Sequence, residues 1–573
     1  MLSDSLGETS RGCGCAGPCG HFVVEDVTND DGQPQAYLNA DERGSLVGSK
    51  ESYTIAEAGN QLIRGDAGWG GVLGQAFTVT YAFRANAPGT MPDDTAGFER
   101  FNAAQIAQAE MALAGWSDAA NIYFTRVGSG SFGEAAYSDQ ATILFGNYSS
   151  GADSASAFGY YPGSTSYSSR AGDVWVNITK GSNATPSVGN HGGMVLAHEI
   201  GHAIGLAHPA DYDSDTSPTY AADAIYYEDS RQYTVMSYFS ETNTGASFGG
   251  RYAAAPLLDD ISAIQQEYGA NLATRTGDTI YGFNSNAGRA WFEATSVASR
   301  PIFAVWDAGG NDTFNFSGWT SAQTIDLRAG NFSNVGGLTG NVAIAANVTI
   351  ENALGGGGAD TITGNSAFNV LEGNGGNDVV WSGAGNDTLR GGDGLDFLRG
   401  EDGDDVLYGG AAFDDMHGNM GRDTEYGGDG DDWVVGGKDM DLLYGELGSD
   451  VIYGNMADDS CYGGDGNDLI RGGQHNDYIE GGAGDDWISG DRESDTIWGG
   501  SGADTFHTWR DAGLDRVMDF NRAEGDSVLV SEGSTYTVSQ LGGDVVIDMG
   551  GGAQMILVGV QMSSLTAGWI VAT

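Results

Sequence analysis

Three histidines and one glutamate are spaced in this chain as the side chains of a metal site would be. They are His198, Glu199, His202 and His208. On a helix, His198 and His202 share one face because they are four residues apart, so both imidazoles can reach one ion. Glycine accepts left-handed backbone angles, so Gly205 can end that helix and bring His208 back as a third ligand. Three nitrogen ligands with one open position are typical of a catalytic zinc ion.

Glu199 lies one step around this helix, where it can act on a water molecule at the metal as a general base. A shorter His-Glu-x-x-His motif occurs by chance. The additional glycine and third histidine, in a chain with 8 histidines, make the metal interpretation much more specific. In this longer form the stretch resembles the metzincin metalloproteases. That resemblance implies a methionine turn beneath the imidazoles, to which Met236 fits. Tyr238 resembles the tyrosine that related enzymes present to the zinc, as a further ligand and a donor to the oxyanion.

The elements that would position these residues form a mixed α and β pattern. Apolar periodicity predicts helices over 56–63, 101–116 and 257–268, with the metal-binding helix over 193–203. Strands are expected over 76–83, 122–124, 142–145 and 173–178. A strand that borders the cleft could pair with an extended peptide through main-chain hydrogen bonds.

Composition sets limits on the possible partners. The chain has 573 residues, enough for about two or three domains. Its net charge is −54, from 24 basic and 78 acidic residues, which excludes binding to nucleic acid and to anionic membranes. Its 94 glycines with only 10 prolines indicate turns rather than collagen, and 4 cysteines exclude a disulfide scaffold. The first residues do not form a secretory signal, and no stretch is apolar enough for membrane insertion.

A nine-residue repeat of the form Gly-Gly-x-Gly-x-Asp-x-apolar-x fills much of the second half. The glycines allow the chain to curl, and carbonyl and aspartate oxygens can surround a hard cation. The apolar residue points inward, so stacked turns share a core. This is the period of a calcium-binding parallel β-roll. The predicted calcium ligands are Asp378, Asp387, Asp396, Asp405, Asp432, Asp450, Asp468, Asp486 and Asp504.

Successive turns should alternate between two edges of the roll, so equivalent turns stack two repeats apart. We call the turns that end at Asp378, Asp396 and their equivalents the first edge, and those that end at Asp387, Asp405 and their equivalents the second edge. The fourth position of the repeat stays mostly glycine on the first edge. On the second edge glycine ends at Gly421 and is replaced by Asp439, Ala457, His475 and Glu493. We therefore predict weak calcium binding on the second edge beyond about 421. Glu425 also departs from the repeat, because it occupies an apolar position.

The zinc motif, the Met236 and Tyr238 turn, the helix over 257–268 and the repeats together resemble the serralysins, the repeat-bearing bacterial metzincins. The stretches 52–54, 116–118 and 277–282 are also similar to that family, and the resemblance extends from 52 to the C-terminus. It implies an α+β metzincin zinc-protease domain followed by an all-β parallel β-roll (RTX) domain. It also implies export through a type I secretion channel. The apolar C-terminal end fits such a signal, although the acidic residue that often accompanies it is absent.

The expected domains are an N-terminal extension and pro-segment over 1–50, the protease domain over 51–272, and the start of the C-terminal β domain over 273–355. The RTX roll follows over 356–510, and a C-terminal β cap with the secretion signal over 511–573. Cys13, Cys15 and Cys19 cluster in the extension. A thiolate that caps the zinc and keeps a zymogen latent is one interpretation. A local disulfide or a disordered tail is the other.

The sequence therefore predicts a secreted, monomeric zinc endopeptidase with one catalytic Zn²⁺ and several structural Ca²⁺ ions. Glu199 would be its general base, and its substrates would be extracellular proteins or peptides. A location at the cell surface fits the same pattern. Two alternatives stay open: a calcium-dependent surface-layer or adhesive RTX protein, and a protease that mainly processes its own N-terminus.

Overall fold

The structure is a computed structural model. It describes residues 37–63, 68–92, 95–151, 155–163, 171–212 and 217–572. The three N-terminal cysteines and the first part of the expected pro-segment lie outside these residues. Within the described chain, no helix combines the length and the hydrophobicity needed to cross a bilayer.

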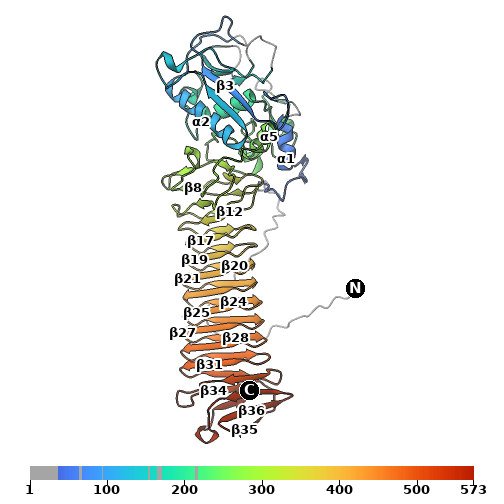
Figure 1. Cartoon of the computed structure of the whole chain (residues 1–573), viewed down its shortest axis with the longest axis vertical. Helices are drawn as coiled ribbons and strands as arrows, with labels where there is room; N and C mark the ends of the chain where they lie inside the picture. Colours follow the sequence, from blue (N-terminus) through green and yellow to red (C-terminus); the bar gives the residue numbers. More distant parts are fainter. Residues whose placement is uncertain are drawn as a thin grey trace, which may run out of the picture. The chain divides into compact units, whose positions relative to one another are not determined.

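The N-terminal part of the described chain is built on a five-stranded sheet with the strand order β4-β3-β5-β7-β6. Figure 1 shows its strand β3 beside the helix α2. Every pair is parallel except the edge strand β6, which runs antiparallel to β7. The strand bounds are β3 Phe77–Phe83, β4 Ile122–Arg126, β5 Ile143–Tyr148, β6 Ala157–Gly159 and β7 Val174–Asn177. The predicted strands are therefore confirmed to within a few residues.

Helices pack against this sheet and around the histidine motif. Their bounds are α1 Ile55–Ile63, α2 Ala103–Ala119, α3 His191–Ala203, α4 Tyr220–Asp223 and α5 Leu258–Tyr268. Asn102 begins α2 through a capping box with Gln105, and Asn190 begins α3 by accepting from the Gly193 amide at 2.9 Å. The helix α3 is buried over nearly its whole length, so the chain around it holds the histidines rigidly. The helix predicted over 193–203 is confirmed, and it begins two residues earlier, at His191.

The described chain is anchored from Tyr37 onward, earlier than the expected boundary near 50. The Leu38 amide donates to the Tyr233 hydroxyl at 2.8 Å, and that hydroxyl donates to the Leu38 carbonyl at 3.1 Å. A short hairpin follows, formed by β1 Leu46–Val47 and β2 Lys50–Glu51. The side chain of Arg43 is fully buried and pairs with both carboxylate oxygens of Asp259, at 2.9 and 3.0 Å. A buried bidentate pair of this kind is costly to break. This stretch therefore packs against the N-terminal α/β region, and Tyr37 and Ala40 also donate to Asn334 and Asn331 ahead of the repeats.

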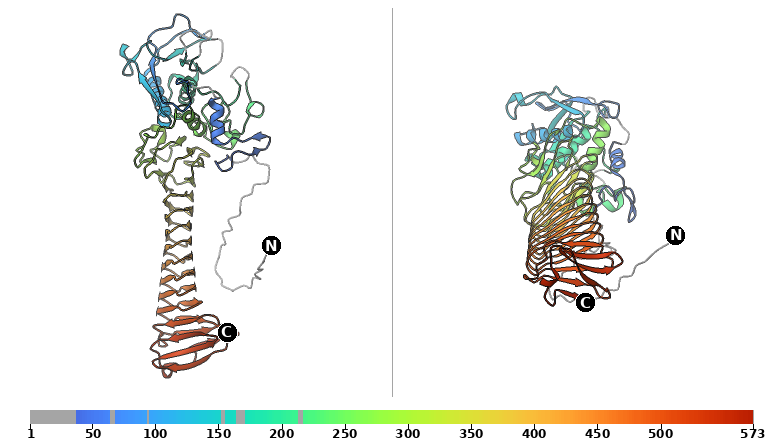
Figure 2. Two further views of the ribbon diagram at one scale, coloured as in Figure 1. Left: turned by 45° about the vertical axis from the view of Figure 1, so that its right-hand side comes forward. Right: turned by 60° about the horizontal axis from the view of Figure 1, so that its bottom comes forward.

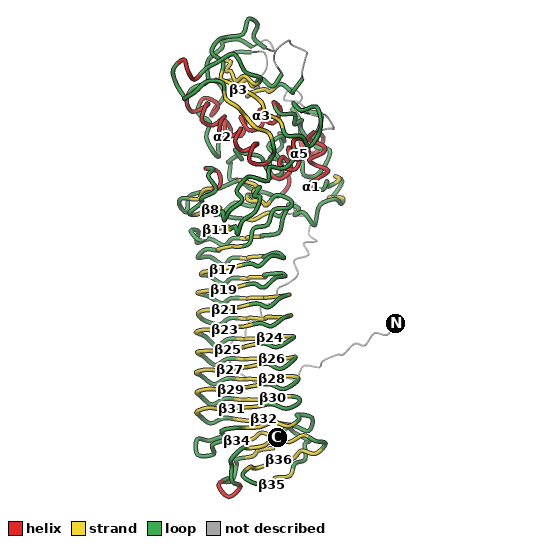
Figure 3. The backbone as a smooth tube through the Cα atoms, viewed as in Figure 1, coloured by secondary structure: helices red, strands yellow, loops and turns green. Residues whose placement is uncertain are grey.

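The second half is a column of stacked turns, in which two long sheets face each other across one shared core (Figures 2 and 3). The first is 16-stranded, and the strands that belong to the repeats pair in parallel. In spatial order its strands are β9 Glu293–Ala294, β8 Ile280–Phe283, β11 Thr313–Asn315, β15 Asn352–Leu354, β17 Val370–Gly375, β19 Thr388–Asp393, β21 Val406–Ala411, β23 Thr424–Asp429, β25 Leu442–Leu447, β27 Ser460–Asp465, β29 Tyr478–Ala483, β31 Thr496–Ser501, β33 Leu514–Val517, β37 Ala553–Leu557, β36 Asp544–Gly550 and β35 Thr537–Leu541.

The second sheet is 12-stranded and takes the alternate strands of the repeat. In spatial order these are β12 Thr324–Asp326, β16 Thr361–Thr363, β18 Val379–Trp381, β20 Phe397–Asp402, β22 Asp415–Met420, β24 Trp433–Lys438, β26 Val451–Met456, β28 Leu469–Gln474, β30 Trp487–Asp491, β32 Thr505–Thr508, β34 Ser527–Val530 and β38 Ile570–Ala572. A small three-stranded sheet of β10 Phe303–Val305, β14 Val342–Ile344 and β13 Phe332–Ser333 precedes the repeats.

The register of the roll follows the repeat. Leu389 pairs with Leu407, and Leu398 pairs with Met416, each 18 residues further along the chain. These inward side chains are fully buried and form one continuous column. The alternation of successive turns between two edges, predicted from the nine-residue period, is confirmed.

Candidate active site

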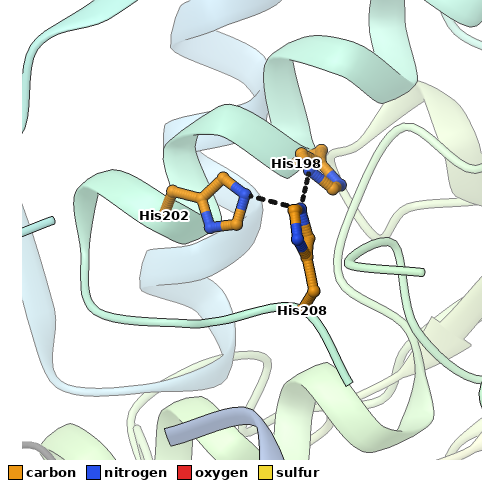
Figure 4. A group of neighbouring side chains, drawn as sticks. All are labelled: His198, His202 and His208. Atoms are coloured by element: carbon orange, nitrogen blue, oxygen red, sulfur yellow. Dashed lines mark hydrogen bonds between the residues drawn. The ribbon is translucent and has the colours of Figure 1, made fainter. Parts of the chain in front are cut away.

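The three histidines of the motif converge on one point (Figure 4). His198 and His202 extend from α3, and His208 returns from the loop after it. The Nε2 atoms of His202 and His208 are 3.0 Å apart, and those of His208 and His198 are 3.2 Å apart. Gly205 has a φ of +120°, and the Leu206 amide bonds back to the Gly201 carbonyl at 2.9 Å. The glycine thus produces the reversal expected from its position.

Each imidazole is oriented by a backbone carbonyl. The Nδ1 atom lies 2.7 Å from the Val235 oxygen in His198, 2.7 Å from the Leu206 oxygen in His202 and 3.1 Å from the Tyr212 oxygen in His208. A carbonyl can only accept, so Nδ1 carries the proton and Nε2 keeps its lone pair. Burial lowers the pKa of His198 to about 4 and that of His202 well below its usual value. Three neutral imidazoles with converging lone pairs fit a zinc ion.

Glu199 is 6 % exposed and faces the edge strand β6. It accepts a hydrogen bond from the Gly159 amide, and its Oε2 has no hydrogen-bond partner among the described residues. Burial raises the pKa of Glu199 to about 8, against the smaller effect of the Gly159 amide. A β-carbon at Gly159 would lie 2.6 Å from the Glu199 carbonyl oxygen, so the strand and the helix touch here. The carboxylate is held between α3 and β6, and its side chain lines the cleft that His198 also lines.

Met236 lies beneath the histidine helix and is fully buried. A β-carbon at Gly201 would lie 2.5 Å from its sulfur and 3.3 Å from the Trp116 ring. Met236 and Trp116 therefore pack so closely against α3 at Gly201 that a larger residue would force them to move. The methionine occupies the place that the sequence predicted for it.

Replacing Gly201 by alanine is expected to lower the melting temperature and to speed zinc loss to a chelator. Alanine favours a helix by about 1 kcal/mol over glycine, but overpacking against Met236 costs about 1–3 kcal/mol. Gly277→Ala is the matched control, since that glycine is exposed and its β-carbon would meet nothing within 4 Å. Differential scanning calorimetry and chelator kinetics give the comparison. A Gly201→Ala protein at least as stable as the control, with unchanged zinc release, would contradict the packing argument.

Tyr238 lies on the open side of the imidazoles and is 37 % exposed. Its ring centroid is 4.4 Å from that of His208 and 5.8 Å from that of His198. Tyr212 stacks on His208 with ring centroids 5.4 Å apart, and its ring also contacts that of Tyr238, at 5.3 Å. The structure therefore brings together His198, Glu199, His202, His208, Met236 and Tyr238.

Two buried aspartates that the sequence did not single out support this arrangement. Asp260 accepts from the Val235 amide at 2.8 Å and from the Thr234 hydroxyl at 2.5 Å, and so fixes the turn whose carbonyl orients His198. Asp229 accepts from the Tyr212 and Ser237 hydroxyls at 2.8 and 2.7 Å. Burial raises the pKa of Asp260 to about 6 and that of Asp229 to about 7. In the sequence, Asp260 is marked only as an acidic residue in the first turn of the helix over 257–268, and this does not indicate that it supports the histidine site.

A cleft of about 300 Å³ opens beside the histidines and is lined by residues of β6, α3 and the methionine turn, including Ala157, His198, Glu199 and Tyr238. The edge of β6 borders it, as expected for a strand that pairs with a peptide. A larger groove of about 940 Å³ lies elsewhere, between the loop at Leu327 and the turn after Trp381. None of the histidine-site residues lines that groove, so we place the chemistry in the smaller cleft.

The repeat aspartates form two ladders along the edges of the roll. In each, one carboxylate oxygen accepts the backbone amide 18 residues earlier, for example at 2.8 Å from Asp432 to Asp450 and 2.7 Å from Asp387 to Asp405. The second oxygen, Oδ2, has no hydrogen-bond partner in the described part of the chain, from Asp378 to Asp504. These aspartates are at most 4 % exposed. Rows of buried, unsatisfied carboxylate oxygens fit hard cations such as Ca²⁺.

Comparison with known proteins agrees with this geometry. Residues 270–536 match a family model described as "Peptidase M10 serralysin C terminal", and residues 108–247 match "Metallo-peptidase family M12". Serralysin C of Dickeya chrysanthemi is 49 % identical over 330 residues, which cover 57 % of this chain and 67 % of that protein. Metalloprotease AprA of Pseudomonas entomophila is 47 % identical over 58 % of this chain and 68 % of its own length.

A third relative, serralysin of Photorhabdus laumondii, is 44 % identical over 59 % of this chain and 69 % of its own length. The aligned regions cover more than two thirds of each of these three relatives, at 44–49 % sequence identity, and this shows the family. The chain belongs to the serralysins, and it is a metalloendopeptidase of the metzincin type with a C-terminal parallel β-roll.

Proposed function

We propose that this protein is a secreted, zinc-dependent endopeptidase that cleaves extracellular proteins or peptides, with a roll that calcium stabilises. The observation that supports it best is the convergence of three Nε2 atoms within 3.2 Å of their neighbours, with every Nδ1 bonded to a backbone carbonyl. Zinc held there would supply a Lewis acid and lower the pKa of a water molecule toward 7.

In this mechanism the chain's own residues position the peptide and move one proton. The substrate backbone pairs with the free edge of β6, which sets the scissile carbonyl beside the histidines. The Glu199 carboxylate takes the proton of the attacking water and later returns it to the leaving amine. The Gly159 amide donates to this carboxylate and helps to hold it in place. Tyr238 donates its phenolic hydrogen to the oxyanion that forms at the carbonyl.

Tyr238→Phe is expected to lower kcat by about 10²–10³-fold with little change in KM, because it removes a donor used mainly in the transition state. Tyr123→Phe is the matched control. That tyrosine is 45 % exposed on β4, at the opposite edge of the sheet from β6. Steady-state kinetics on a fluorogenic peptide provide the measurement. A Tyr238→Phe enzyme with the kcat of the control would exclude the oxyanion role.

Calcium is proposed to act on the roll rather than on the chemistry. The carboxylates of a metal-free chain repel one another, and a cation that binds only the folded form drives folding where it is abundant. Such a chain can leave the cell unfolded through a type I exporter and fold outside. The test of the whole proposal is casein digestion by the purified protein, with and without chelator and with zinc or calcium returned separately. An adhesive or surface-layer protein would show no digestion under any of these conditions.

A further inference from the structure

One end of the cleft beside the histidines is basic, in a chain that is strongly acidic overall. His191 and Arg231 line this cleft together with His198, and Glu199 is the only acid among the described residues that line it. The whole chain has 24 basic residues against 78 acidic ones. The proposed hydrolysis uses neither His191 nor Arg231, so their presence in the cleft needs another explanation.

The first two turns of α3 connect the histidine site to this basic end. His191 begins the helix and His198 follows seven residues later, so the two lie on one face, about 10 Å apart along the axis. Met194 and Val195 lie between them and also line the cleft. The wall of the cleft is therefore apolar next to the histidine site and basic at its far end.

The ring of Tyr252 holds both basic groups in place. Its centroid lies 5.2 Å from that of the His191 ring, in an edge-to-face contact, and 5.2 Å from the Cζ atom of Arg231. A guanidinium over a tyrosine ring is attracted by the negative face of the ring. The Tyr252 amide donates to the Gly189 carbonyl at 3.2 Å, which ties this ring to the segment that leads into α3. His191 and Arg231 are therefore fixed at the same end of the cleft.

The Arg231 guanidinium has hydrogen-bonding capacity to spare, since a guanidinium carries five N–H donors. Its Nη2 lies 3.7 Å from Oε2 of the buried Glu241, which is too far for a hydrogen bond. Its Nε is buried and has no hydrogen-bond partner in the described part of the chain. The side chain is nevertheless 22 % exposed. A fixed and loosely paired guanidinium of this kind fits a carboxylate that comes from outside the chain.

The cleft is placed to receive the residue that follows the cleaved bond. That residue carries the leaving amine, and in the proposed mechanism Glu199 returns a proton to this amine. Glu199 lines the cleft, whereas His202 and His208 are not among its lining residues. A side chain on the amine side of the cleaved bond can therefore extend from Glu199 along the apolar wall toward the basic end.

We propose that this end of the cleft selects substrates with an acidic residue, glutamate above all, directly after the cleaved bond. The apolar stem of the glutamate packs against Met194 and Val195, and its carboxylate accepts hydrogen bonds from Arg231 and His191. The inference rests on the proposed function of this site, to which it adds a class of substrate. Arg231 and His191 are then specificity residues that take no part in the proton transfer.

Three fluorogenic peptides that differ only in the residue after the cleaved bond, which is glutamate, glutamine or lysine, test this with the full-length, calcium-replete protein. Mass spectrometry of the products identifies the cleaved bond. We expect kcat/KM to be about 10-fold higher for the glutamate peptide than for the glutamine peptide, the lower end of what a hydrogen bond to a charged group contributes. The lysine peptide should be the poorest. The advantage of glutamate should shrink as salt is raised, because Arg231 is partly exposed.

Arg231→Gln combined with Glu241→Gln removes the guanidinium without leaving a buried, unpaired carboxylate. This double variant is expected to bring the ratio of the glutamate to the glutamine peptide close to one. Arg251→Gln is the matched control, because it removes the same charge from an exposed arginine that does not line the cleft. Arg231→Lys, which keeps the charge but not the planar fork, should give a ratio between those of the wild type and the double variant. It serves, with the salt dependence, if the double variant does not fold.

The outcomes separate this inference from the proposed function. A wild type that cleaves the peptides without preferring glutamate to glutamine would overturn the inference and leave the endopeptidase intact. A preference that persists in the double variant, or in Arg231→Lys, at the level of Arg251→Gln would overturn the role of Arg231. A wild type that cleaves none of the three peptides and no casein would overturn the proposed function itself.

Discussion

Replacing Glu199 by glutamine is expected to lower kcat/KM by about 10²–10⁴-fold, the usual contribution of a general base. The amide keeps the size of the side chain and can still contact the edge strand at Gly159, but it cannot accept the proton of the attacking water. The imidazoles and their carbonyl partners do not depend on Glu199. The variant should therefore bind zinc with the stoichiometry of the wild type.

The comparison requires kinetics and metal analysis on the same preparations. Glu293→Gln is the matched control, because Glu293 is exposed on β9 and outside the cleft. Glu199→Ala should give the same loss. If Glu199→Gln holds a full complement of zinc and still cleaves peptides at the rate of the control, another group is the base. If the variant loses zinc, Glu199 has a structural role instead.

Removal of calcium is expected to reverse the pH dependence of the stability of the roll. Burial raises the pKa values of the ladder aspartates, to about 6 in Asp396 and Asp432, about 8 in Asp405 and about 9 in Asp441. Their pKa in an unfolded chain is about 3.9. The folded, metal-free roll therefore binds protons more tightly than the unfolded chain does. This contribution to stability is complete below about pH 4 and is lost progressively above it, by about pH 6 for Asp396 and Asp432 and by about pH 9 for Asp441.

In chelator, the full-length protein should accordingly unfold at a lower temperature at pH 8 than at pH 5. Bound calcium stabilises the ionised carboxylates and lowers their pKa, so in excess calcium the order should be opposite. A difference of more than about 10 °C in chelator is expected, since each kcal/mol shifts a domain of this size by about 2–4 °C and several carboxylates contribute. Trp433 and Trp487 on the repeat strands offer fluorescence probes. A metal-free protein that gains stability from pH 5 to pH 8 would contradict the ladder argument.

Local spacing made the histidine site predictable. His198 and His202 are one helical turn apart, and Gly205 determines the reversal to His208 within the same short stretch. The roll was predictable for a similar reason, because the nine-residue period fixes both the inward column and the alternation of edges. In both cases the geometry follows from neighbours in the sequence.

The supporting contacts were not predictable, because they join distant parts of the chain. Arg43 and Asp259 are 216 residues apart, and nothing in the polar stretch before 50 marks this arginine as buried. Asp229 and Asp260 are two acids among 78 acidic residues, so their type carries little information. Glu425 was visible as a departure from the repeat, but the contact of its Oε1 with the Gly418 amide, at 2.9 Å, depends on the fold of that turn.

The central claim, that three imidazoles hold one zinc ion that peptide hydrolysis requires, is tested most directly by zinc content and activity measured together. Both quantities are measured on the same sample of calcium-replete wild type and on the same sample of His202→Ala, purified in parallel. We expect one zinc per wild-type chain, the loss of zinc and activity together in His202→Ala, and the return of activity when zinc is restored to chelated wild type. Active wild-type protein without stoichiometric zinc, or a His202→Ala variant that keeps both zinc and activity, would contradict the account.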